Sequence, residues 1–386
     1  MRPVFISVAI RIAFVLWVLI CMEACLQVFY YLTAHQTLFT RTAIPIFTPN
    51  EYCGFFNKPD LSYVHRTSEF TCRIYTNAEG FRVPRPGVEY SRIKPSGTFR
   101  TLLLGSSFAF GWGVNYEDTA AAKIEGLLRR YFKGKPAIEV INAGVPSLAP
   151  LPQLNWFEHV GCSYRPDLVL QFIYGSMVID PDDDKGLYVD PQGYLKNSAL
   201  SAEQRFIEVA KRSALVFYGW TLYARWLAGS SAEIAGAGRH LEQARPFSPD
   251  TPEVKLSLVY YRRLAQAALK CGTRLSIVYF PLSYCVHRGD LARWRHLGVF
   301  NESIDDQIAL DRDFCCYLRD KGFDCLDITP ELVKAAIDNP ERLYYWLDIH
   351  WTRRGNLVAA RSVAQHLADE FSHRPGQGLD GVPTIK

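Results

Sequence analysis

The first stretch of the chain is apolar almost without interruption. Over residues 4–22 nearly every residue is apolar, and Arg11 is the only charge. At about 1.5 Å per residue, a run of roughly 20 such residues crosses the hydrocarbon core of a bilayer. Arg2 and Arg11 lie in its N-terminal half, so the positive-inside rule places Met1 in the cytoplasm. We predict an uncleaved, single-pass signal anchor over 1–33, in preference to a cleaved signal peptide.

The pattern changes after the anchor. Residues 34–98 are rich in Pro, Gly, Asn and aromatic residues and are predicted to form an arm of short strands and loops. From residue 99 onward, short apolar runs alternate with amphipathic stretches, which predicts a parallel sheet covered by helices on both faces. The predicted strands are 100–105, 137–142, 167–174, 273–280 and 325–328, and the predicted helices are 118–131, 150–161, 253–271, 303–321, 330–338 and 354–371.

One segment interrupts this alternation. Residues 176–252 are predicted to be a helical insert, within which Ala214–Ala228 is a very apolar, aromatic helix. That helix is short for a membrane span. It is compatible with the membrane interface, with a lid over the active site, or with packing on the core. Residues 373–386 are predicted to be a flexible tail.

Composition and charge exclude some classes of protein. The 386 residues carry a formal net charge of only +4 without a basic run, which speaks against nucleic-acid binding. Ten cysteines are present. Eight follow the anchor, and an even number there fits an oxidising compartment, with Cys53 and Cys72 as a plausible pair. The chain has neither Cys-x-x-Cys nor His-Glu-x-x-His spacing, so we expect no metal and no cofactor.

The candidate chemistry begins where the first predicted strand of the sheet ends, at Gly105-Ser106-Ser107. Ligand sites in α/β sheets lie at the carboxyl ends of the strands, so a serine there is a candidate nucleophile. A serine hydroxyl needs a base, usually a histidine that a carboxylate holds in one tautomer. Asp348 and His350 lie two residues apart just before the last predicted helix. We therefore predict a triad of Ser107, His350 and Asp348, with the backbone N–H groups of Ser107 and Gly144 as oxyanion donors.

These residues resemble the sequence blocks of the GDSL/SGNH esterases and acyltransferases. Residues 102–114, Leu-Leu-Leu-Gly-Ser-Ser-Phe-Ala-Phe-Gly-Trp-Gly-Val, are similar to the family's first block, usually Gly-Asp-Ser-Phe-x-Phe-Gly-x-Gly-Val. The resemblance places the nucleophile on Ser107, and Ser106 replaces the usual Asp. Residues 142–146 resemble the second block, whose oxyanion glycine is Gly144 here. Residues 346–356 resemble the last block and imply Asp348 as triad acid and His350 as base.

The third block differs from the family pattern. Where the family has Gly-Asn-Asp, this chain has Gly175-Ser176-Met177, so Ser176 stands in place of the asparagine that completes the oxyanion hole. The loss of one such donor typically costs about 10²–10³ in rate. A serine hydroxyl is a candidate replacement, directly or through water. The resemblance covers about 100–175 and 255–371, with the blocks in the family's order.

The resemblance implies a flavodoxin-like, three-layer α/β/α sandwich formed by 99–175 and 253–372, behind the N-terminal transmembrane helix. It also implies a serine esterase or O-acyltransferase that acts on acyl groups, acetyl first, of an extracytoplasmic glycan. The predicted location is the inner membrane, with the catalytic domain in the periplasm. Two alternatives stay open: a lipid esterase, and a catalytically inactive subunit that binds glycan or scaffolds an envelope assembly.

Overall fold

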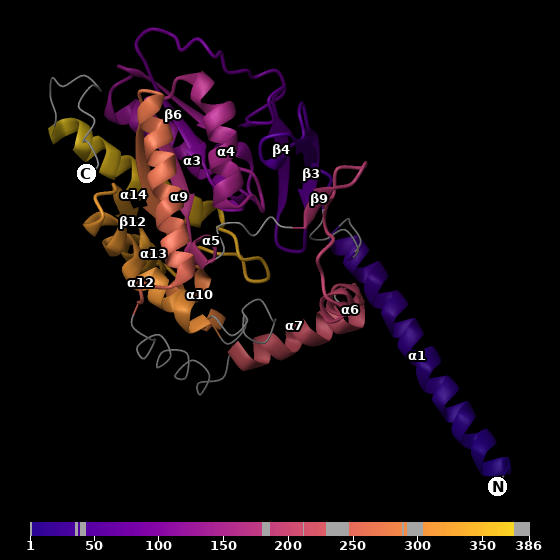
Figure 1. Cartoon of the computed structure of the whole chain (residues 1–386). Coiled ribbons are helices and arrows are strands. Elements are labelled where there is room, and N and C mark those ends of the chain that lie inside the picture. Colours follow the sequence, from indigo (N-terminus) through magenta and orange to yellow (C-terminus); the bar gives the residue numbers. More distant parts are fainter. Residues whose placement is uncertain are drawn as a thin grey trace.

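The chain forms an eight-stranded sheet from strands between Ser62 and Asp327, and helices cover both faces of the sheet (Figure 1). The computed structural model describes residues 2–34, 38, 44–179, 186–210, 212–228, 247–287, 289–291 and 304–373. The strand order is β12-β11-β8-β6-β7-β5-β4-β3. These strands are β3 (Ser62–Arg66), β4 (Thr71–Thr76), β5 (Arg82–Val83), β6 (Thr98–Leu104), β7 (Ala137–Asn142), β8 (Leu168–Ile173), β11 (Arg274–Tyr279) and β12 (Cys325–Asp327).

The parallel part of the sheet has the flavodoxin-like order. β7, β6, β8, β11 and β12 are neighbours in that order, and every pair among them is parallel. The chain goes from β6 outward to β7, then crosses back to β8 on the other side of β6. This reversal makes the carboxyl end of β6 a topological switch point, the place where open α/β sheets bind ligands. The predicted α/β fold is confirmed, and its central sheet is mostly parallel.

The segment predicted as an arm adds strands to this sheet. β3, β4 and β5 continue it beyond β7 in antiparallel fashion, through a single pairing of Arg82 with Asn142. The sheet is therefore mixed, whereas the sequence predicted only parallel strands. The added strands meet β7 only at its last residue, Asn142, so they extend the sheet from the carboxyl end of β7.

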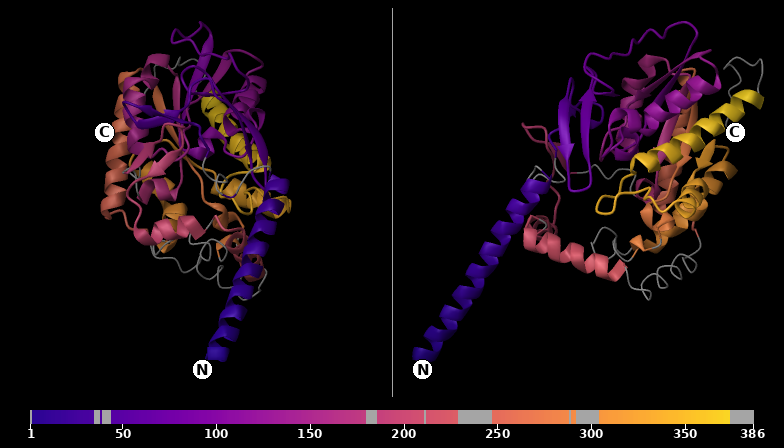
Figure 2. Two further views of the ribbon diagram at one scale, coloured as in Figure 1. Left: turned by 90° about the vertical axis from the view of Figure 1, so that its right-hand side faces the viewer. Right: turned by 180° about the vertical axis from the view of Figure 1, so that it is seen from behind.

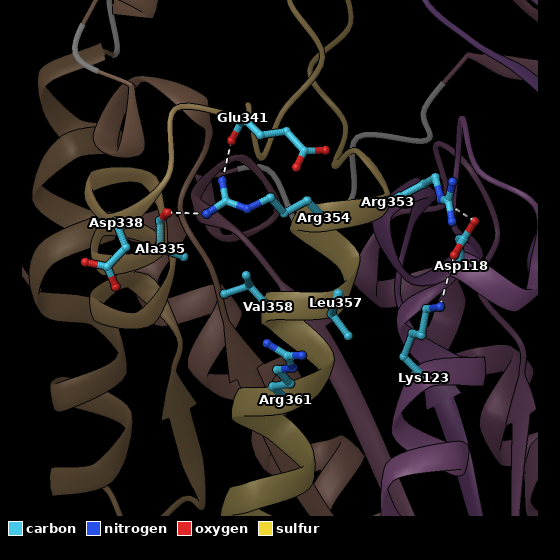
Figure 3. A pocket seen from close by; sticks show the side chains of 10 residues that line it. All are labelled: Asp118, Lys123, Ala335, Asp338, Glu341, Arg353, Arg354, Leu357, Val358 and Arg361. Carbon is cyan, nitrogen blue, oxygen red and sulfur yellow. Dashed lines mark hydrogen bonds and ion pairs between the residues drawn. The ribbon is translucent and has the colours of Figure 1, made fainter.

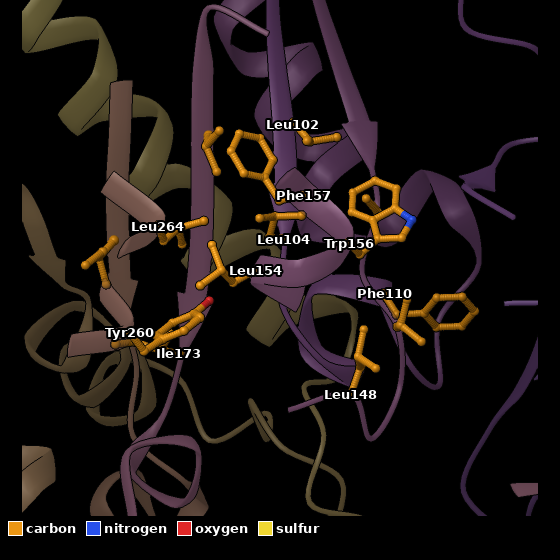
Figure 4. Packing of buried hydrophobic residues seen from close by; sticks show 14 of the residues in the cluster. Leu102, Leu104, Phe110, Leu148, Leu154, Trp156, Phe157, Ile173, Tyr260 and Leu264 are labelled. Atoms are coloured by element: carbon orange, nitrogen blue, oxygen red, sulfur yellow. The ribbon is translucent and has the colours of Figure 1, made fainter. Parts of the chain in front are cut away.

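Side chains of β6 alternate between two hydrophobic layers. Leu102 and Leu104 pack with one layer and Leu103 with the other, and all three are almost completely buried. Burial on both faces explains why β6 is a continuous apolar run. Figure 4 shows Leu102 and Leu104 beside Leu154 and Phe157 of α4. One layer contains α4 (Pro150–His159), α9 (Pro252–Lys270) and α12 (Ile304–Asp320), and the other α3 (Ala120–Tyr131), α13 (Thr329–Asp338) and α14 (Arg353–His373).

The predicted elements from residue 99 onward are all present, with bounds that differ from the structure by at most two residues. The predicted helix Ala214–Ala228 is also confirmed, as α7. The tail lies outside the described residues, apart from His373. The remaining elements are β1 (Phe47–Asn50), β2 (Gly54–Asn57), β9 (Leu187–Val189), β10 (Leu195–Asn197), α2 (Ser107–Phe110), α5 (Gly175–Ile179), α6 (Ala202–Ala210), α10 (Ser283–Val286) and the 3₁₀ turns Tyr116–Asp118 and Gly161–Tyr164.

The N-terminal residues form one long helix, α1 (Arg2–Ala34), which projects away from the sheet in all the views of Figures 1 and 2. Within Ser7–Thr33, a window of 18 residues has a mean hydropathy of 2.3 and no residue of that window is buried by the rest of the chain. By length and composition α1 meets the criteria of a membrane span, which an N-terminal signal sequence also meets.

Two disulfides join helices to their neighbours. Cys162 bonds Cys271 and Cys315 bonds Cys325, each with 5.8 Å between the Cα atoms. The suggested pairing of Cys53 with Cys72 is wrong. Cys53 lies in the β1–β2 turn, where its thiol hydrogen-bonds Asn50 Oδ1 and the Phe55 carbonyl, whereas Cys72 is buried on β4 in a different sheet. Disulfides persist in oxidising compartments, so the two bonds support an extracytoplasmic location.

Because the two disulfides close loops of very different length, their removal should have unequal effects. The partners are 109 residues apart in one and 10 in the other. Chain entropy assigns about 4.7 kcal/mol to a 100-residue loop and about 3 kcal/mol to a 15-residue loop. We expect the double variant Cys162→Ala/Cys271→Ala to lose more unfolding free energy in urea than the control Cys315→Ala/Cys325→Ala. An equal or reversed ranking would show that local contacts, rather than loop closure, determine the stabilisation.

Candidate active site

Ser107 follows β6 through a sharp turn at Gly105. Gly105 has φ of +148°, and a Cβ there would lie 2.8 Å from the Ala109 Cβ and 3.1 Å from the Phe172 carbonyl oxygen. Glycine is therefore required if α2 is to start directly above the strand. α2 begins at Ser107, so its hydroxyl lies at the carboxyl edge of the sheet, at the switch point.

His350 and Asp348 lie in the loop between α13 and α14. The loop is held to the body of the domain at its end, because Asn356 of α14 accepts a hydrogen bond from the Ala120 N–H and donates to the Trp351 and Thr352 carbonyls. A Cβ on Gly355 would lie 2.1 Å from the Leu343 carbonyl oxygen, so glycine allows α14 to start against its own loop. These contacts bring residues 348–350 over β6.

The three predicted side chains form one hydrogen-bonded series. Ser107 Oγ lies 2.6 Å from His350 Nε2, and His350 Nδ1 hydrogen-bonds Asp348 Oδ1. With Nδ1–H donating to the carboxylate, Nε2 is free to accept the serine proton. Asp348 also accepts the His350 backbone N–H at 3.0 Å and the Trp112 indole N–H at 3.3 Å.

The electrostatics keep Asp348 ionised. Burial raises the pKa of Asp348, but the charge of His350 and the hydrogen bonds from His350 and Trp112 outweigh it, and the net pKa is lowered. An ionised carboxylate beside the imidazole is what stabilises the imidazolium that forms when serine is deprotonated. The imidazole is also packed between two aromatic rings, since the Phe108 and Trp112 ring centroids lie 4.9 and 5.6 Å from that of His350.

Sequence reasoning missed Glu69, which supports the loop of the triad acid. It stands in the β3–β4 turn, and its carboxylate accepts the backbone N–H groups of Trp346 (2.6 Å), Leu347 (2.8 Å) and Asp348 (2.9 Å). Three donors converging on one carboxylate hold the backbone of Asp348 in place. No local pattern connects positions 69 and 348, so only the pairing of the arm with the main sheet reveals this contact.

The predicted oxyanion donors differ in the hydrogen bonds that they make. The Ser107 N–H is the first of α2 and has no acceptor among the described residues. The Gly144 N–H donates to Asn142 Oδ1 at 3.0 Å, and its carbonyl accepts from Asn57 Nδ2 at 2.9 Å. The backbone of Ser176 lies in α5, while its side chain lies outside the described residues.

A hollow of about 520 Å³ lies near the start of α14, and none of the triad residues lines it (Figure 3). Several of its charged side chains have partners within the chain. Asp118 pairs with Arg353 at 2.7 Å and with Lys123 at 3.0 Å, and Arg354 donates to main-chain carbonyls that include that of Asn339. The hollow is therefore a charged surface feature beside the site and contributes no group to its chemistry.

The described residues contain one group with metal-ligand geometry: Asp324, His366 and Glu370, whose ligand atoms lie within 4.8 Å of one another. Arg274 pairs with Glu370 at 2.8 Å, and His366 pairs with Asp324 at 3.3 Å. The hydrogen bond to Asp324 raises the pKa of His366. Arg274 and His366 thus each pair with one of the two carboxylates, and the group forms a structural ion-pair cluster.

Comparison with known families agrees with this geometry. Residues 249–383 match the family described as "SGNH hydrolase-like domain, acetyltransferase AlgX". This segment, about a third of the chain, is similar to an SGNH hydrolase-like domain. The match contains Asp348 and His350, while Ser107 lies before it. The predicted resemblance and the expectation of an enzyme of the SGNH hydrolase and acetyltransferase type are confirmed at this level.

Solved structures give weaker likenesses. They include a putative lipolytic protein of the G-D-S-L family from Desulfitobacterium hafniense (13% identity, TM-score 0.34, covering 69% of this chain and 98% of that one). A catalytic mutant of the acetylxylan esterase Axe2 from Geobacillus stearothermophilus has 13% identity and a TM-score of 0.34, covering 71% of this chain and 95% of the other. Since these scores are low, the assignment rests on the family match and the site. No curated protein matches the chain.

Loss of Glu69 should impair catalysis without weakening substrate binding. Glu69→Ala leaves three N–H groups without their acceptor, and a shift of about 1 Å in a catalytic group costs up to about 10² in rate. We expect kcat for p-nitrophenyl acetate to fall by about that factor while KM changes little, with Glu69→Gln intermediate. The control is Glu79→Ala, which removes an exposed ion pair with Arg92. A raised KM at constant kcat would instead place Glu69 in contact with the substrate.

Glu69 should also change how the stability of the protein depends on pH. Burial, followed by the negative charge of Asp348, raises the pKa of Glu69 above its ordinary 4.5, although the three N–H groups oppose this. The folded state therefore holds the proton more tightly than the unfolded state, and stability from this group is lost as the pH rises from about 4.5 through the raised value. We expect the Tm advantage of the native protein over Glu69→Gln to shrink over that range; a growing advantage would contradict the raised pKa.

Gly144 is sterically required behind Ser107. A Cβ at Gly144 would lie 2.3 Å from the Phe110 nitrogen and 2.7 Å from the Ala109 carbonyl carbon, both in the backbone of α2. We expect Gly144→Ala to displace α2 and to lower both kcat and Tm. The matched control is Gly126→Ala in α3, where the added Cβ meets nothing within 4 Å, and which should stabilise by about 0.4–1 kcal/mol. Normal activity of Gly144→Ala would show that the turn behind α2 can move enough to accommodate the added Cβ.

Proposed function

We propose that this protein is a membrane-anchored serine esterase or O-acyltransferase that acts on ester-linked acetyl groups of an extracytoplasmic glycan. The hydrogen-bonded series Ser107–His350–Asp348 carries the proposal, since it supplies a nucleophile, a base and an orienting acid within reach of one another. The acetyltransferase named for the matched family supports acetyl as the acyl group. α1 and the two disulfides support the extracytoplasmic location.

In the first half-reaction Ser107 Oγ attacks the ester carbonyl carbon while its proton moves to His350 Nε2. The negative charge passes to the carbonyl oxygen, and Asp348 stabilises the imidazolium. When the tetrahedral intermediate collapses, the bond to the sugar oxygen breaks and that oxygen takes the proton from Nε2. The products are a free sugar hydroxyl and an acetyl-Ser107 ester.

The second half-reaction reverses these steps with a new acceptor. His350 Nε2 takes a proton from the acceptor hydroxyl, the acceptor oxygen attacks the acetyl carbonyl, and Ser107 leaves with the proton from Nε2. Water as acceptor gives acetate and hydrolysis, whereas a sugar hydroxyl gives transfer. The same residues serve both outcomes, and access of water to the acyl-enzyme decides between them.

The oxyanion donors in this proposal are the Ser107 and Gly144 amides, with Ser176 in the place of the family's asparagine. The Ser107 amide is the stronger candidate, because an oxyanion that takes the Gly144 N–H has to compete with Asn142 Oδ1. The second candidate function, an inactive subunit that binds glycan, is favoured by this occupied amide together with the asparagine-to-serine change. Activity of the serine distinguishes the two.

The test uses the full-length protein in detergent micelles. We expect a fluorophosphonate to label Ser107, and Ser107→Ala to abolish labelling and to lower p-nitrophenyl acetate hydrolysis by at least about 10³-fold. The matched control is Ser106→Ala: Ser106 Oγ is buried without a partner among the described residues, so its removal should cost little. Absence of labelling in a folded native protein would favour the inactive subunit.

A further inference from the structure

α7 has an apolar face that the described chain leaves exposed. Its exposed large side chains fall on one side of the helix, over roughly half of its circumference at 3.6 residues per turn. Three of them form an aromatic row, with ring centroids 6.0 Å apart for Trp220 and Tyr223 and 6.3 Å for Tyr223 and Trp226. The exposed set is Val216, Trp220, Leu222, Tyr223 and Trp226, with exposed fractions between 44% and 71%.

The opposite side of α7 packs against α1. Tyr30 and Phe217 meet edge to face with centroids 5.5 Å apart, and the Phe29 and Tyr218 centroids lie 6.0 Å apart. Ala214 and Tyr30 are fully buried in this small cluster. The contact gives α7 a defined orientation on α1, and Figures 1 and 2 show it running away from α1 at a steep angle.

Glu23, the one acidic residue of α1, fastens the start of α7. Its carboxylate accepts the Ser213 hydroxyl (2.8 Å) and the backbone N–H groups of Ala214 (2.7 Å) and Leu215 (2.9 Å). Gln27 then donates to Glu23 and to the Arg212 carbonyl, at 2.7 Å each. A carboxylate at a helix N-terminus satisfies N–H groups that have no partner within the helix and complements the helix dipole. This contact explains an acidic residue inside an otherwise apolar helix.

The positions of Glu23 and Gln27 along α1 set the depth of α7 relative to the bilayer. A hydrocarbon core of about 30 Å takes up about 20 helical residues at 1.5 Å each. If the core begins with the apolar run at residue 4, it ends near Glu23. Glu23 and Gln27 then lie at the outer edge of the core, and α7 leaves α1 at the interface, where Trp and Tyr are enriched.

We propose that α7 is an interfacial helix, bound to α1 through Glu23, whose apolar face inserts into the outer leaflet of the bilayer that α1 crosses. The occupant is lipid rather than a protein partner, because Glu23 fastens α7 to α1, the candidate membrane span, and α7 carries exposed Trp and Leu side chains there. Amphipathic helices with Trp and Leu on one side bind membrane interfaces in this way. The inference depends on the proposed membrane anchor and goes beyond the catalytic proposal.

The experiment uses the full chain in phosphatidylcholine–phosphatidylglycerol vesicles that contain a photoactivatable lipid, with labelled peptides found by mass spectrometry. We expect label on α1 and on Ala214–Ala228. The double variant Leu222→Glu/Trp226→Glu should lower α7 labelling by about fivefold or more and leave α1 labelling unchanged. The control, Ile337→Glu, places one such charge on an exposed apolar residue of α13 and should change neither.

A second variant tests the link to α1. Glu23→Ala removes the acceptor of the Ser213 hydroxyl and of the Ala214 and Leu215 N–H groups. Amide exchange at Ala214 and Leu215 should therefore rise by about tenfold or more, and α7 labelling should fall. Label on α1 with none on α7 would overturn the proposal and favour solvent or a protein partner at this face. Absence of label on both helices would overturn the anchor and the interfacial helix together. Fluorophosphonate labelling of Ser107 in the same sample reports separately on the esterase.

Discussion

The pairing of β6 with β7 on one side and β8 on the other is the constraint on which the site depends. Because both neighbours are parallel to it and both faces are covered, β6 is a buried strand whose carboxyl end is fixed on all sides. The turn at Gly105 then places the Ser107 hydroxyl at the carboxyl edge of the sheet. The loop of Asp348 and His350 meets it there because α14 packs against α3 on the same side of the sheet.

Two carboxylates near the site have opposite electrostatic surroundings. At Asp348 burial is outweighed by the charge of His350 and by the hydrogen bonds that the carboxylate accepts, so its pKa is lowered. At Glu69 burial, followed by the negative charge of Asp348, outweighs the N–H donors, so its pKa is raised. Pairs of acids whose pKa values are pushed apart usually have different roles. Here one carboxylate faces the base, and the other holds the backbone of the first. Asp348 therefore takes part in the chemistry, whereas Glu69 keeps Asp348 in position.

A second carboxylate that accepts several backbone N–H groups lies at the membrane end of the molecule. Glu23 receives the N-terminal N–H groups of α7, as Glu69 receives those of residues 346–348. In both places one acidic side chain joins segments that are far apart in sequence. Charge-assisted hydrogen bonds oppose the cost of removing the charge from water. At Glu69 they oppose it only in part, since burial still raises its pKa.

The sequence by itself determined the local elements and the residue types of the site. Alternation of apolar runs with amphipathic stretches was enough for the strands and helices from residue 99 onward, because side-chain period and burial are properties of neighbouring residues. Ser107 after a strand, and Asp348 two residues before His350, were likewise visible as local patterns. Only the tertiary structure decided that β3–β5 extend the sheet, that Cys162 bonds Cys271, and that Glu69 and Glu23 reach their partners. Those contacts join residues tens to hundreds of positions apart, and several arrangements of the same elements would satisfy the local pattern equally well; the packing of the whole chain selects one.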